Sequence, residues 1–191
     1  MSEGSIQEKR KRRGRRGRVT LLLGSMFSGK SSELLKIIER TNYQKVSACL
    51  IRPNLDTRNF IARNANHNSK FTVIETNQIN ISDVMEFDVV FIDEGHFITD
   101  LGVTCHKIAL LGKTVYVAAL PGDSDFRPWD EVSRLLPYID RVRKIDAVCV
   151  ECGYGSTFTF TDAKKNGQVL IGDKAYKALC RRCHDEFTRK D

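Results

Sequence analysis

The sequence lacks any long apolar stretch. Nowhere in its 191 residues does an apolar run approach the roughly 20 residues that a membrane-spanning helix needs. The N-terminus is too basic and too poor in apolar residues for a secretory signal. These absences predict a cytoplasmic protein, and disulfide bonds are rare in that compartment. We therefore expect the six cysteines to bind metal or to be buried as free thiols.

Outside one segment the sequence also has little net charge. The formal charge is +7, but residues 1–18 hold eight Lys or Arg and two Glu, which leaves only +1 for the rest of the chain. The basicity belongs to an N-terminal tail, residues 1–17, which we expect to be disordered. Such a tail can be a nuclear localisation signal, a nucleic-acid contact or a solvated extension, so it does not decide the enzyme class.

Beyond the tail, strand and helix patterns alternate. Short apolar runs that end at turn or acidic residues predict parallel strands, and apolar residues at helical spacing predict the helices between them. The expected strands are 19–23, 46–51, 71–74, 89–92 and 114–120, and the expected helices are 31–41 and 100–111. Residues 52–70 are polar and irregular, and we expect a functional loop or a hairpin there. The alternation predicts an α/β fold with a mainly parallel, doubly wound sheet and helices on both faces.

A phosphate-binding pattern, G-x-x-x-x-G-K-[ST], follows the first predicted strand. Its glycines let the backbone direct N–H groups and a helix N-terminus at an anion. In this pattern Lys30 reaches the β- and γ-phosphates and the Ser31 hydroxyl binds Mg²⁺. The motif lies between a strand and a helix, so we expect a P-loop (RecA-like) domain, residues 18–146, that binds ATP with Mg²⁺. The loop residues are Gly24, Ser25, Met26, Phe27, Ser28, Gly29, Lys30 and Ser31.

Two carboxylates follow the apolar strand at 89–92. In P-loop folds a carboxylate at such a strand end holds the magnesium, directly or through water, and Asp93 takes that role. Glu94 can then orient or deprotonate the attacking group, which is either a water or a substrate hydroxyl. Two acidic residues at a strand end often form only a solvated turn, but the phosphate loop makes the catalytic interpretation the better one.

Two CxxC pairs lie near the C-terminus, in a segment that we assign to a small zinc-ribbon domain, residues 147–191. Four thiolates in this arrangement predict a closed structural Zn²⁺ site that holds an extended loop between the pairs. His184 adjoins the second pair but is not needed as a ligand. Cys49 and Cys105 lie in a predicted strand and helix, and we expect both to be buried as small apolar groups. The four predicted ligands are Cys149, Cys152, Cys180 and Cys183.

In their order along the chain, these motifs resemble those of the type II thymidine kinase family, the cellular and poxviral kind. The resemblance extends from Arg18 to Cys183, nearly the whole chain beyond the tail. It includes the phosphate loop, DTR at Asp56 to Arg58, FIDEGHF at 91–97, GKTVYVAAL at 112–120 and both CxxC pairs. The DTR segment and the paired CxxC motifs make it specific.

The resemblance implies transfer of the ATP γ-phosphate to the 5′-hydroxyl of thymidine, and also of deoxyuridine, giving dTMP for the salvage of DNA precursors. It implies that Glu94 takes the proton of that hydroxyl while Asp93 and Ser31 serve the Mg²⁺. Arg58 and Asp56 would lie near the reacting phosphate and the sugar. It also implies a homotetramer, and a zinc-held loop that folds over the base as a lasso. The expected nucleoside contacts are Met26, Asp56, His96, Phe97, Leu120, Thr159, Leu170 and Tyr176.

Two departures from the family pattern concern the base pocket. Ser124 stands where an aromatic residue commonly walls the pocket, and Phe126 or Trp129 would have to compensate through a change of register. His96 stands where glutamine is common, and its ring can still touch the base or the sugar. Both departures leave phosphoryl transfer untouched and bear on the strictness of thymidine preference.

Two other function classes fit parts of the sequence. Residues 93–96 also spell a DExH box, which together with the basic tail suggests a nucleic-acid-dependent ATPase of the helicase type. ATPases of this type bind ATP between two sheet domains, and the length of this chain suits only one such domain. The non-enzymatic alternative is a zinc-ribbon nucleic-acid binder with a degenerate ATPase fold, and the intact loop and carboxylates argue against it.

Overall fold

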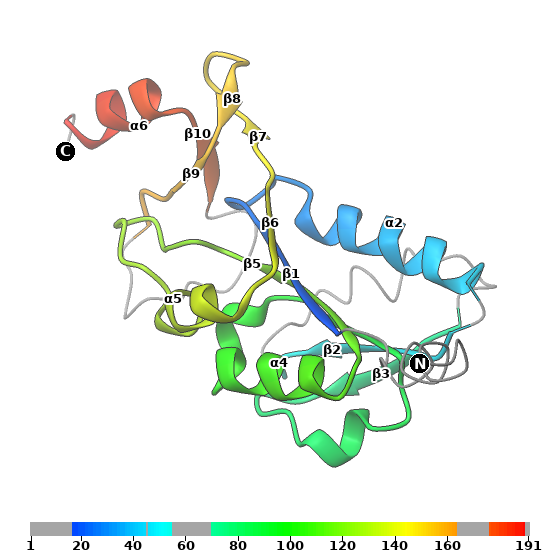
Figure 1. The fold of residues 1–191 in the computed structure, drawn as a ribbon. Helices are drawn as coiled ribbons and strands as arrows, with labels where there is room; N and C mark the ends of the chain where they lie inside the picture. The colour runs from blue at the N-terminus through cyan, green and yellow to red at the C-terminus, as the bar shows by residue number, and fades with distance from the viewer. Residues whose placement is uncertain (1–16, 45, 55–69, 164–175, 190–191) are drawn as a thin grey trace, which may run out of the picture.

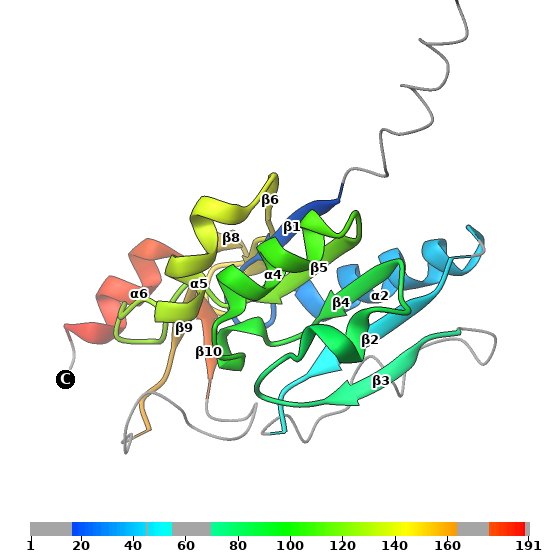
Figure 2. The same ribbon diagram turned by 60° about the horizontal axis from the view of Figure 1, so that its bottom comes forward.

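The computed structural model describes residues 17–44, 46–54, 70–163 and 176–189 (Figures 1 and 2). Three features predicted from the sequence lie outside these described residues: most of the basic tail, the DTR segment with Asp56 and Arg58, and Leu170 of the lasso. What was expected of them stays a prediction.

A parallel six-stranded sheet forms the centre of the fold. Its strand order is β3-β2-β4-β5-β1-β6, and every neighbouring pair runs parallel. The carboxyl ends of all six strands therefore meet at one edge, where β1 and β4 flank β5 and ligands bind in folds of this kind. The strands are β1 (Arg18–Leu23), β2 (Ala48–Arg52), β3 (Thr72–Glu75), β4 (Val89–Ile92), β5 (Thr114–Ala119) and β6 (Arg141–Lys144).

Helices cover both faces of this sheet, as predicted. On one face Leu34 and Ile38 of the first helix pack against Phe91 of β4. On the opposite face Cys105 and Ile108 pack against alternate residues of the same strands, because successive side chains of a strand point to opposite faces. Within the described residues, none of the helices has the length and apolar character to cross a membrane. The helices are α2 (Lys30–Asn42), α4 (Leu101–Leu110) and α5 (Asp130–Leu135), with short 3₁₀ turns η1 (Ile81–Val84), η2 (Gly95–Phe97) and η3 (Leu136–Tyr138).

The C-terminal part consists of two antiparallel strand pairs and one helix. Strand β7 pairs with β8, and β9 pairs with β10. The apolar core of this part is small, so packing alone stabilises it weakly and a bound metal would add much of its stability. The elements are β7 (Ala147–Val148), β8 (Gly155–Ser156), β9 (Phe158–Phe160), β10 (Lys177–Leu179) and α6 (Arg181–Thr188).

The sequence predicted the inner strands and long helices to within a few residues but missed β6 and α5. All four residues of β6 are exposed, so no apolar run marks it. Helix α5 has only six residues, too few for a helical period to be evident. The predicted end of the helix at 100–111 is confirmed, because Gly112 follows α4 with a φ of 81°.

Gly102, in the first turn of α4, lies where a side chain has no room. A Cβ there would lie 2.7 Å from the carbonyl oxygen of Arg134, in α5, and 3.0 Å from the Tyr138 ring. We expect Gly102→Ala to lower the free energy of unfolding by roughly 1–3 kcal/mol through overpacking, despite the better helix propensity of alanine. Gly155→Ala is the matched control, because a Cβ there meets nothing within 4 Å. Equal denaturation midpoints for the two variants would contradict this expectation.

Candidate active site and metal centre

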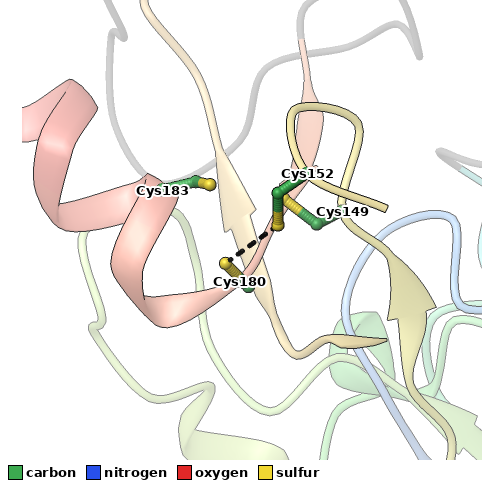
Figure 3. A group of neighbouring side chains, drawn as sticks. All are labelled: Cys149, Cys152, Cys180 and Cys183. Atoms are coloured by element: carbon green, nitrogen blue, oxygen red, sulfur yellow. Dashed lines mark hydrogen bonds between the residues drawn. The ribbon is translucent and has the colours of Figure 1, made fainter. Parts of the chain in front are cut away.

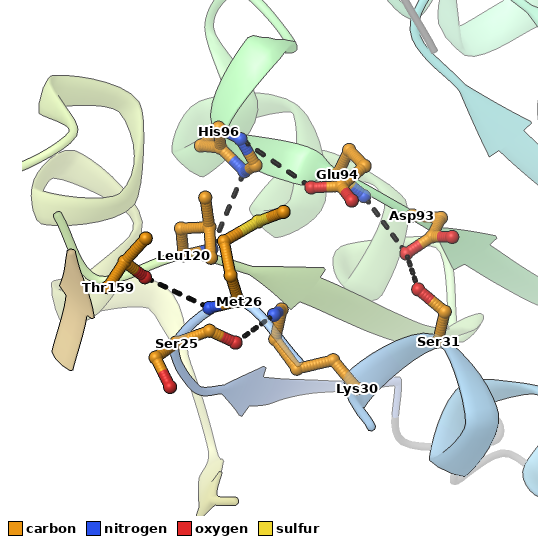
Figure 4. A network of polar contacts seen from close by, with 9 residues as sticks. All are labelled: Ser25, Met26, Lys30, Ser31, Asp93, Glu94, His96, Leu120 and Thr159. Atoms are coloured by element: carbon orange, nitrogen blue, oxygen red, sulfur yellow. Dashed lines mark hydrogen bonds and ion pairs between the residues drawn. The ribbon is translucent and has the colours of Figure 1, made fainter. Parts of the chain in front are cut away.

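The predicted phosphate loop turns between the end of β1 and the start of α2 (Figure 4). Gly29 precedes α2 with a φ of 81°, in the left-handed region that glycine adopts without strain. Gly24 packs so closely on the Ile145 carbonyl and the Ser28 side chain that a Cβ would not fit. The Lys30 side chain folds back over the loop, and its Nζ donates to the Ser25 carbonyl oxygen at 2.8 Å. The N-terminus of α2 and a buried ammonium group therefore both belong to this loop, the combination that binds phosphate.

One hydrogen bond joins the phosphate loop to the end of β4. The Ser31 hydroxyl donates to Oδ1 of Asp93 at 3.1 Å, and the same oxygen accepts the backbone N–H of Glu94 at 3.1 Å. Asp93 is only 5% exposed. The two side chains predicted to serve magnesium are thus brought together, and hydroxyl and carboxylate oxygens are the donors that Mg²⁺ prefers.

Glu94 has a backbone conformation that glutamate rarely adopts. Its φ is 48° and its ψ is 44°, in the left-handed region, which costs of the order of 1 kcal/mol or more for a residue with a Cβ. Its side chain is 8% exposed, and its Oε2 lies 3.5 Å from Nε2 of His96. The fold therefore holds a buried carboxylate next to Asp93, where a general base is expected.

Three rings pack together beside this carboxylate. The ring of His96 lies 4.1 Å from that of Phe97 and 4.7 Å from that of Trp129, measured between centroids. The rings of Phe97 and Trp129 meet edge-on at 5.3 Å. Leu120 follows β5 and reaches the same group, because its backbone N–H donates to Nδ1 of His96 at 3.4 Å. The predicted pocket residues His96, Phe97 and Leu120 are therefore close to one another.

The conformation of residues 121–129 determines which aromatic ring packs against His96 and Phe97. The sequence left Phe126 and Trp129 as alternatives for the position of Ser124. Trp129 contacts His96 and Phe97, whereas the Phe126 ring packs 5.4 Å from that of Phe158 in β9. Ser124 is buried, and its hydroxyl has no hydrogen-bond partner among the described residues.

The carboxylate of Asp123 holds this segment in its hairpin shape. It accepts the backbone N–H groups of Asp125 and Arg127 at 2.8 and 3.0 Å, and the Arg127 side chain at 2.9 Å. Burial alone would raise the pKa of Asp123, but these hydrogen bonds lower it below its usual value. The carboxylate is therefore charged at neutral pH and keeps the hairpin closed.

A hydrogen bond joins the C-terminal part to the phosphate loop. The backbone N–H of Met26 donates to Oγ1 of Thr159 in β9 at 3.0 Å (Figure 4). Thr159 is 7% exposed, so little water competes for this bond. Tyr176, next to β10, is half-buried, and its contact with a nucleoside stays a prediction.

A buried cation at the same edge of the sheet was not expected from the sequence. Arg52 ends β2, and the preceding residue, Ile51, accepts the backbone N–H of Asp93 at 2.9 Å. The Arg52 side chain is 8% exposed, and its Nη2 lies 3.0 Å from Oε1 of Glu75. The segment 52–70 looked polar and irregular, so nothing in the sequence marked its first residue as buried.

The four predicted zinc ligands come together in the C-terminal part (Figure 3). One pair lies in the turn between β7 and β8, and the other lies where β10 joins α6. The four sulfur atoms all lie within 4.8 Å of one another, and the sulfurs of Cys152 and Cys180 are 3.6 Å apart. A tetrahedral zinc site with bonds of about 2.3 Å has sulfurs roughly 3.8 Å apart, so this group can hold Zn²⁺.

The surroundings of the sulfurs favour a thiolate at one of them. Burial opposes ionisation of Cys149, but the backbone N–H groups of Cys180, Cys152 and Glu151 lower its pKa to about 6. Burial and the neighbouring sulfurs raise the pKa of Cys183, so its thiol resists ionisation in the absence of a cation. A cation at the centre would stabilise the remaining thiolates.

The other two cysteines are fully buried in the main core, as the sequence predicted. Burial raises the pKa of Cys49 and of Cys105 to about 12, so both stay protonated and unreactive. His184 is also buried, and it packs against the rings of Phe126 and Phe160 at 4.7 and 5.5 Å. The pKa of His184 is lowered by its burial.

Comparison with known proteins agrees with this geometry. The family model for thymidine kinase matches residues 17–184. A thymidine kinase of Bacteroides thetaiotaomicron is 35% identical over 188 residues, covering 96% of this chain and 92% of that protein. The thymidine kinase of sheeppox virus is 32% identical over 171 residues, covering 88% of this chain and 97% of that protein. Among solved structures, the flagellar accessory protein FlaH of Methanocaldococcus jannaschii shares the fold, with a TM-score of 0.54 at 15% identity over 82% of each chain.

The cysteine group provides a direct test of the metal centre. We expect the purified protein to contain one zinc ion per chain, and the double variant Cys180→Ser/Cys183→Ser to lose it, because two ligands do not retain zinc through dialysis. The variant should also melt at a lower temperature. Elemental analysis after dialysis measures the zinc, and Cys105→Ser is the control that should keep it. Zinc retained at wild-type stoichiometry by the double variant would contradict the assignment.

Proposed function

The chain belongs to the thymidine kinase family, and we propose that Glu94, Asp93 and Ser31 carry out its phosphoryl transfer. Members of this family are ATP-dependent nucleoside kinases, and this chain phosphorylates thymidine. The observation that carries the assignment of these residues is the hydrogen bond between Ser31 and Asp93, with Glu94 directly beside it. This contact supports the proposal, because Ser31, Asp93 and Glu94 lie together at one edge of the sheet.

In this proposal the triphosphate of ATP lies against the phosphate loop. The backbone N–H groups at the start of α2 and the Lys30 ammonium bind the β- and γ-phosphates. Ser31 and Asp93 hold the Mg²⁺, which neutralises charge on the phosphates when it is bound. Little covalent chemistry is needed from the protein in such a transfer, so positioning and electrostatics account for most of the catalysis.

Glu94 accepts the proton of the thymidine 5′-hydroxyl. As the O5′–Pγ bond forms, the bond between Pγ and the bridging oxygen breaks and the electron pair leaves with ADP. The buried carboxylate suits this role, because few waters compete for it. Arg58 and Asp56, outside the described residues, are assigned to the reacting phosphate and the sugar on the family resemblance.

We assign the nucleoside base to Phe97, Leu120 and their neighbours. Phe97 and Leu120 supply apolar surface for the thymine ring and its methyl group, and Met26 and Thr159 close the side next to the phosphate loop. The structural Zn²⁺ supports this pocket indirectly, because the C-terminal part carries Thr159. Leu170 and Tyr176 belong to the proposed lasso over the base. The same pocket accommodates deoxyuridine, which lacks only the methyl group.

The nucleic-acid-dependent ATPase is the disfavoured alternative, because the family and the named relatives are thymidine kinases. We place the reaction in the cytoplasm, where free thiols persist, since all six cysteines are free. Nuclear entry or nucleic-acid contact through residues 1–16 stays a prediction, because the tail lies outside the described residues.

An assay with labelled ATP, Mg²⁺ and each of the four deoxynucleosides, with and without single-stranded DNA, tests the function. We expect labelled dTMP from thymidine and no dependence on DNA. Glu94→Gln should lower kcat roughly 10²- to 10⁴-fold, the usual contribution of a general base, while ATP affinity stays within about twofold. DNA-stimulated hydrolysis without a labelled nucleoside would contradict the kinase assignment. Turnover retained by Glu94→Gln would remove Glu94 as the base.

We also propose that the chain assembles as a homotetramer and that β6 forms one of its interfaces. Strand β6 ends the sheet, and no strand of the described part of the chain pairs with its outer side. An exposed strand edge is a template for pairing with another chain. Val142 in β6 is 50% exposed, and Val148 and Val150 nearby along the chain are 67% and 61% exposed, so apolar surface continues beyond the edge.

Light scattering coupled to gel filtration tests this assembly. We expect a mass four times the 21.7 kDa of the chain, and a smaller mass for Val142→Glu, because a carboxylate in the interface is desolvated without a partner. Val103→Glu is the matched control and should leave the mass unchanged, since that valine is similarly exposed, at 44%, but lies on α4 and not on the sheet edge that β6 forms. A monomeric wild-type protein at micromolar concentration would refute the proposal.

A further inference from the structure

His96 has both ring nitrogens in polar contact with the protein. Its Nδ1 accepts the backbone N–H of Leu120 at 3.4 Å, and its Nε2 lies 3.5 Å from Oε2 of Glu94 (Figure 4). The sequence suggested that this residue touches the base or the sugar. The geometry points instead to a positioning role: we propose that His96 fixes the direction of the Glu94 carboxylate. This inference rests on the proposed function, in which Glu94 is the base.

The backbone of Leu120 determines which nitrogen of His96 carries the proton. A nitrogen that accepts an N–H uses its lone pair, so in the neutral ring the proton is on Nε2. That N–H faces Oε2 of Glu94 and attracts the carboxylate.

Burial keeps the His96 ring in this orientation. The side chains of His96 and Glu94 are 1% and 8% exposed, which strengthens their mutual attraction because little water screens it. The rings of Phe97 and Trp129 pack against that of His96 at 4.1 and 4.7 Å. Rotation of the ring would break the contact with Leu120 and disturb this packing, so Nε2 stays directed at Glu94.

The consequence is a restriction on the Glu94 side chain, because its Oε2 is held by His96. The direction of the carboxylate matters, because a base that is displaced by about 1 Å can lose 10²-fold in rate. His96 thus acts through Glu94 on the rate of transfer, and leaves the binding of the nucleoside unchanged.

Two isosteric substitutions separate this role from others. The glutamine amide in His96→Gln reaches about as far as Nε2 and keeps a donor on Glu94, whereas the asparagine in His96→Asn reaches only as far as Nδ1 and keeps the contact with Leu120. We expect His96→Asn to lower kcat roughly 10- to 100-fold with KM for thymidine within about twofold, and His96→Gln to restore kcat to within about threefold of wild type. Steady-state kinetics give both constants, and thermal melts show that the two variants fold equally.

The other outcomes overturn the proposal. A raised KM in both variants with kcat unchanged would mean that His96 contacts the nucleoside directly. Equal losses of kcat in both variants would mean a packing role. Because His96 acts through Glu94, adding His96→Asn to Glu94→Gln should leave the residual rate unchanged, and a further loss would again indicate packing.

If Glu94→Gln itself keeps its turnover, the proposed function fails. If it is inactive while His96→Asn is fully active, only the positioning role fails.

Discussion

The hydrogen bond between Ser31 and Asp93 is the contact on which the rest of the site depends. It joins the first turn of α2 to the end of β4, through two residues that are 62 positions apart along the chain. The parallel sheet makes this contact possible, because it brings the carboxyl ends of β1 and β4 to one edge with only β5 between them. The phosphate-loop residue Ser31 and the Asp93 carboxylate thereby lie side by side, and Glu94 follows as the next residue along the chain. In the proposed function the metal, the phosphates and the base are therefore positioned by the edge of the sheet.

The other half of the site depends on a part of the chain with little core of its own. Four short strands and α6 surround the cysteine group, and the buried apolar residues beside it are few. Zinc binding in such a part is coupled to folding, because the ligands come together only when the strands pair. Thr159 lies in this part and accepts the N–H of Met26, so a change at the cysteine group can reach the phosphate loop. In the proposed function this contact links nucleoside recognition to metal binding.

The sequence predicted best what local chemistry determines. The phosphate loop and the CxxC pairs have fixed spacings imposed by the groups they bind, and the inner strands are apolar because helices cover both faces. By contrast, β6 is exposed along its length and α5 is short, so neither has a local pattern. The choice between Phe126 and Trp129 depends on the hairpin that Asp123 closes, and the burial of Arg52 depends on its position between β3 and β4. Both are consequences of tertiary packing that no window of the sequence contains.

His96 shows that a sequence motif alone does not reveal which groups its residues contact. A polar residue two positions after the base is naturally assigned to the substrate, since it lies beside the reacting groups in sequence. The contacts of its two nitrogens come from Glu94, its near neighbour, and from Leu120, which lies 24 positions away at the end of β5. The left-handed backbone of Glu94 turns the chain so that Glu94 and Leu120 face each other. The 3₁₀ turn of residues 95–97 holds the imidazole ring of His96 between them. The strained backbone of Glu94 and the fixed orientation of the His96 ring are thus two results of one local conformation. The sheet imposes this conformation where β4 ends.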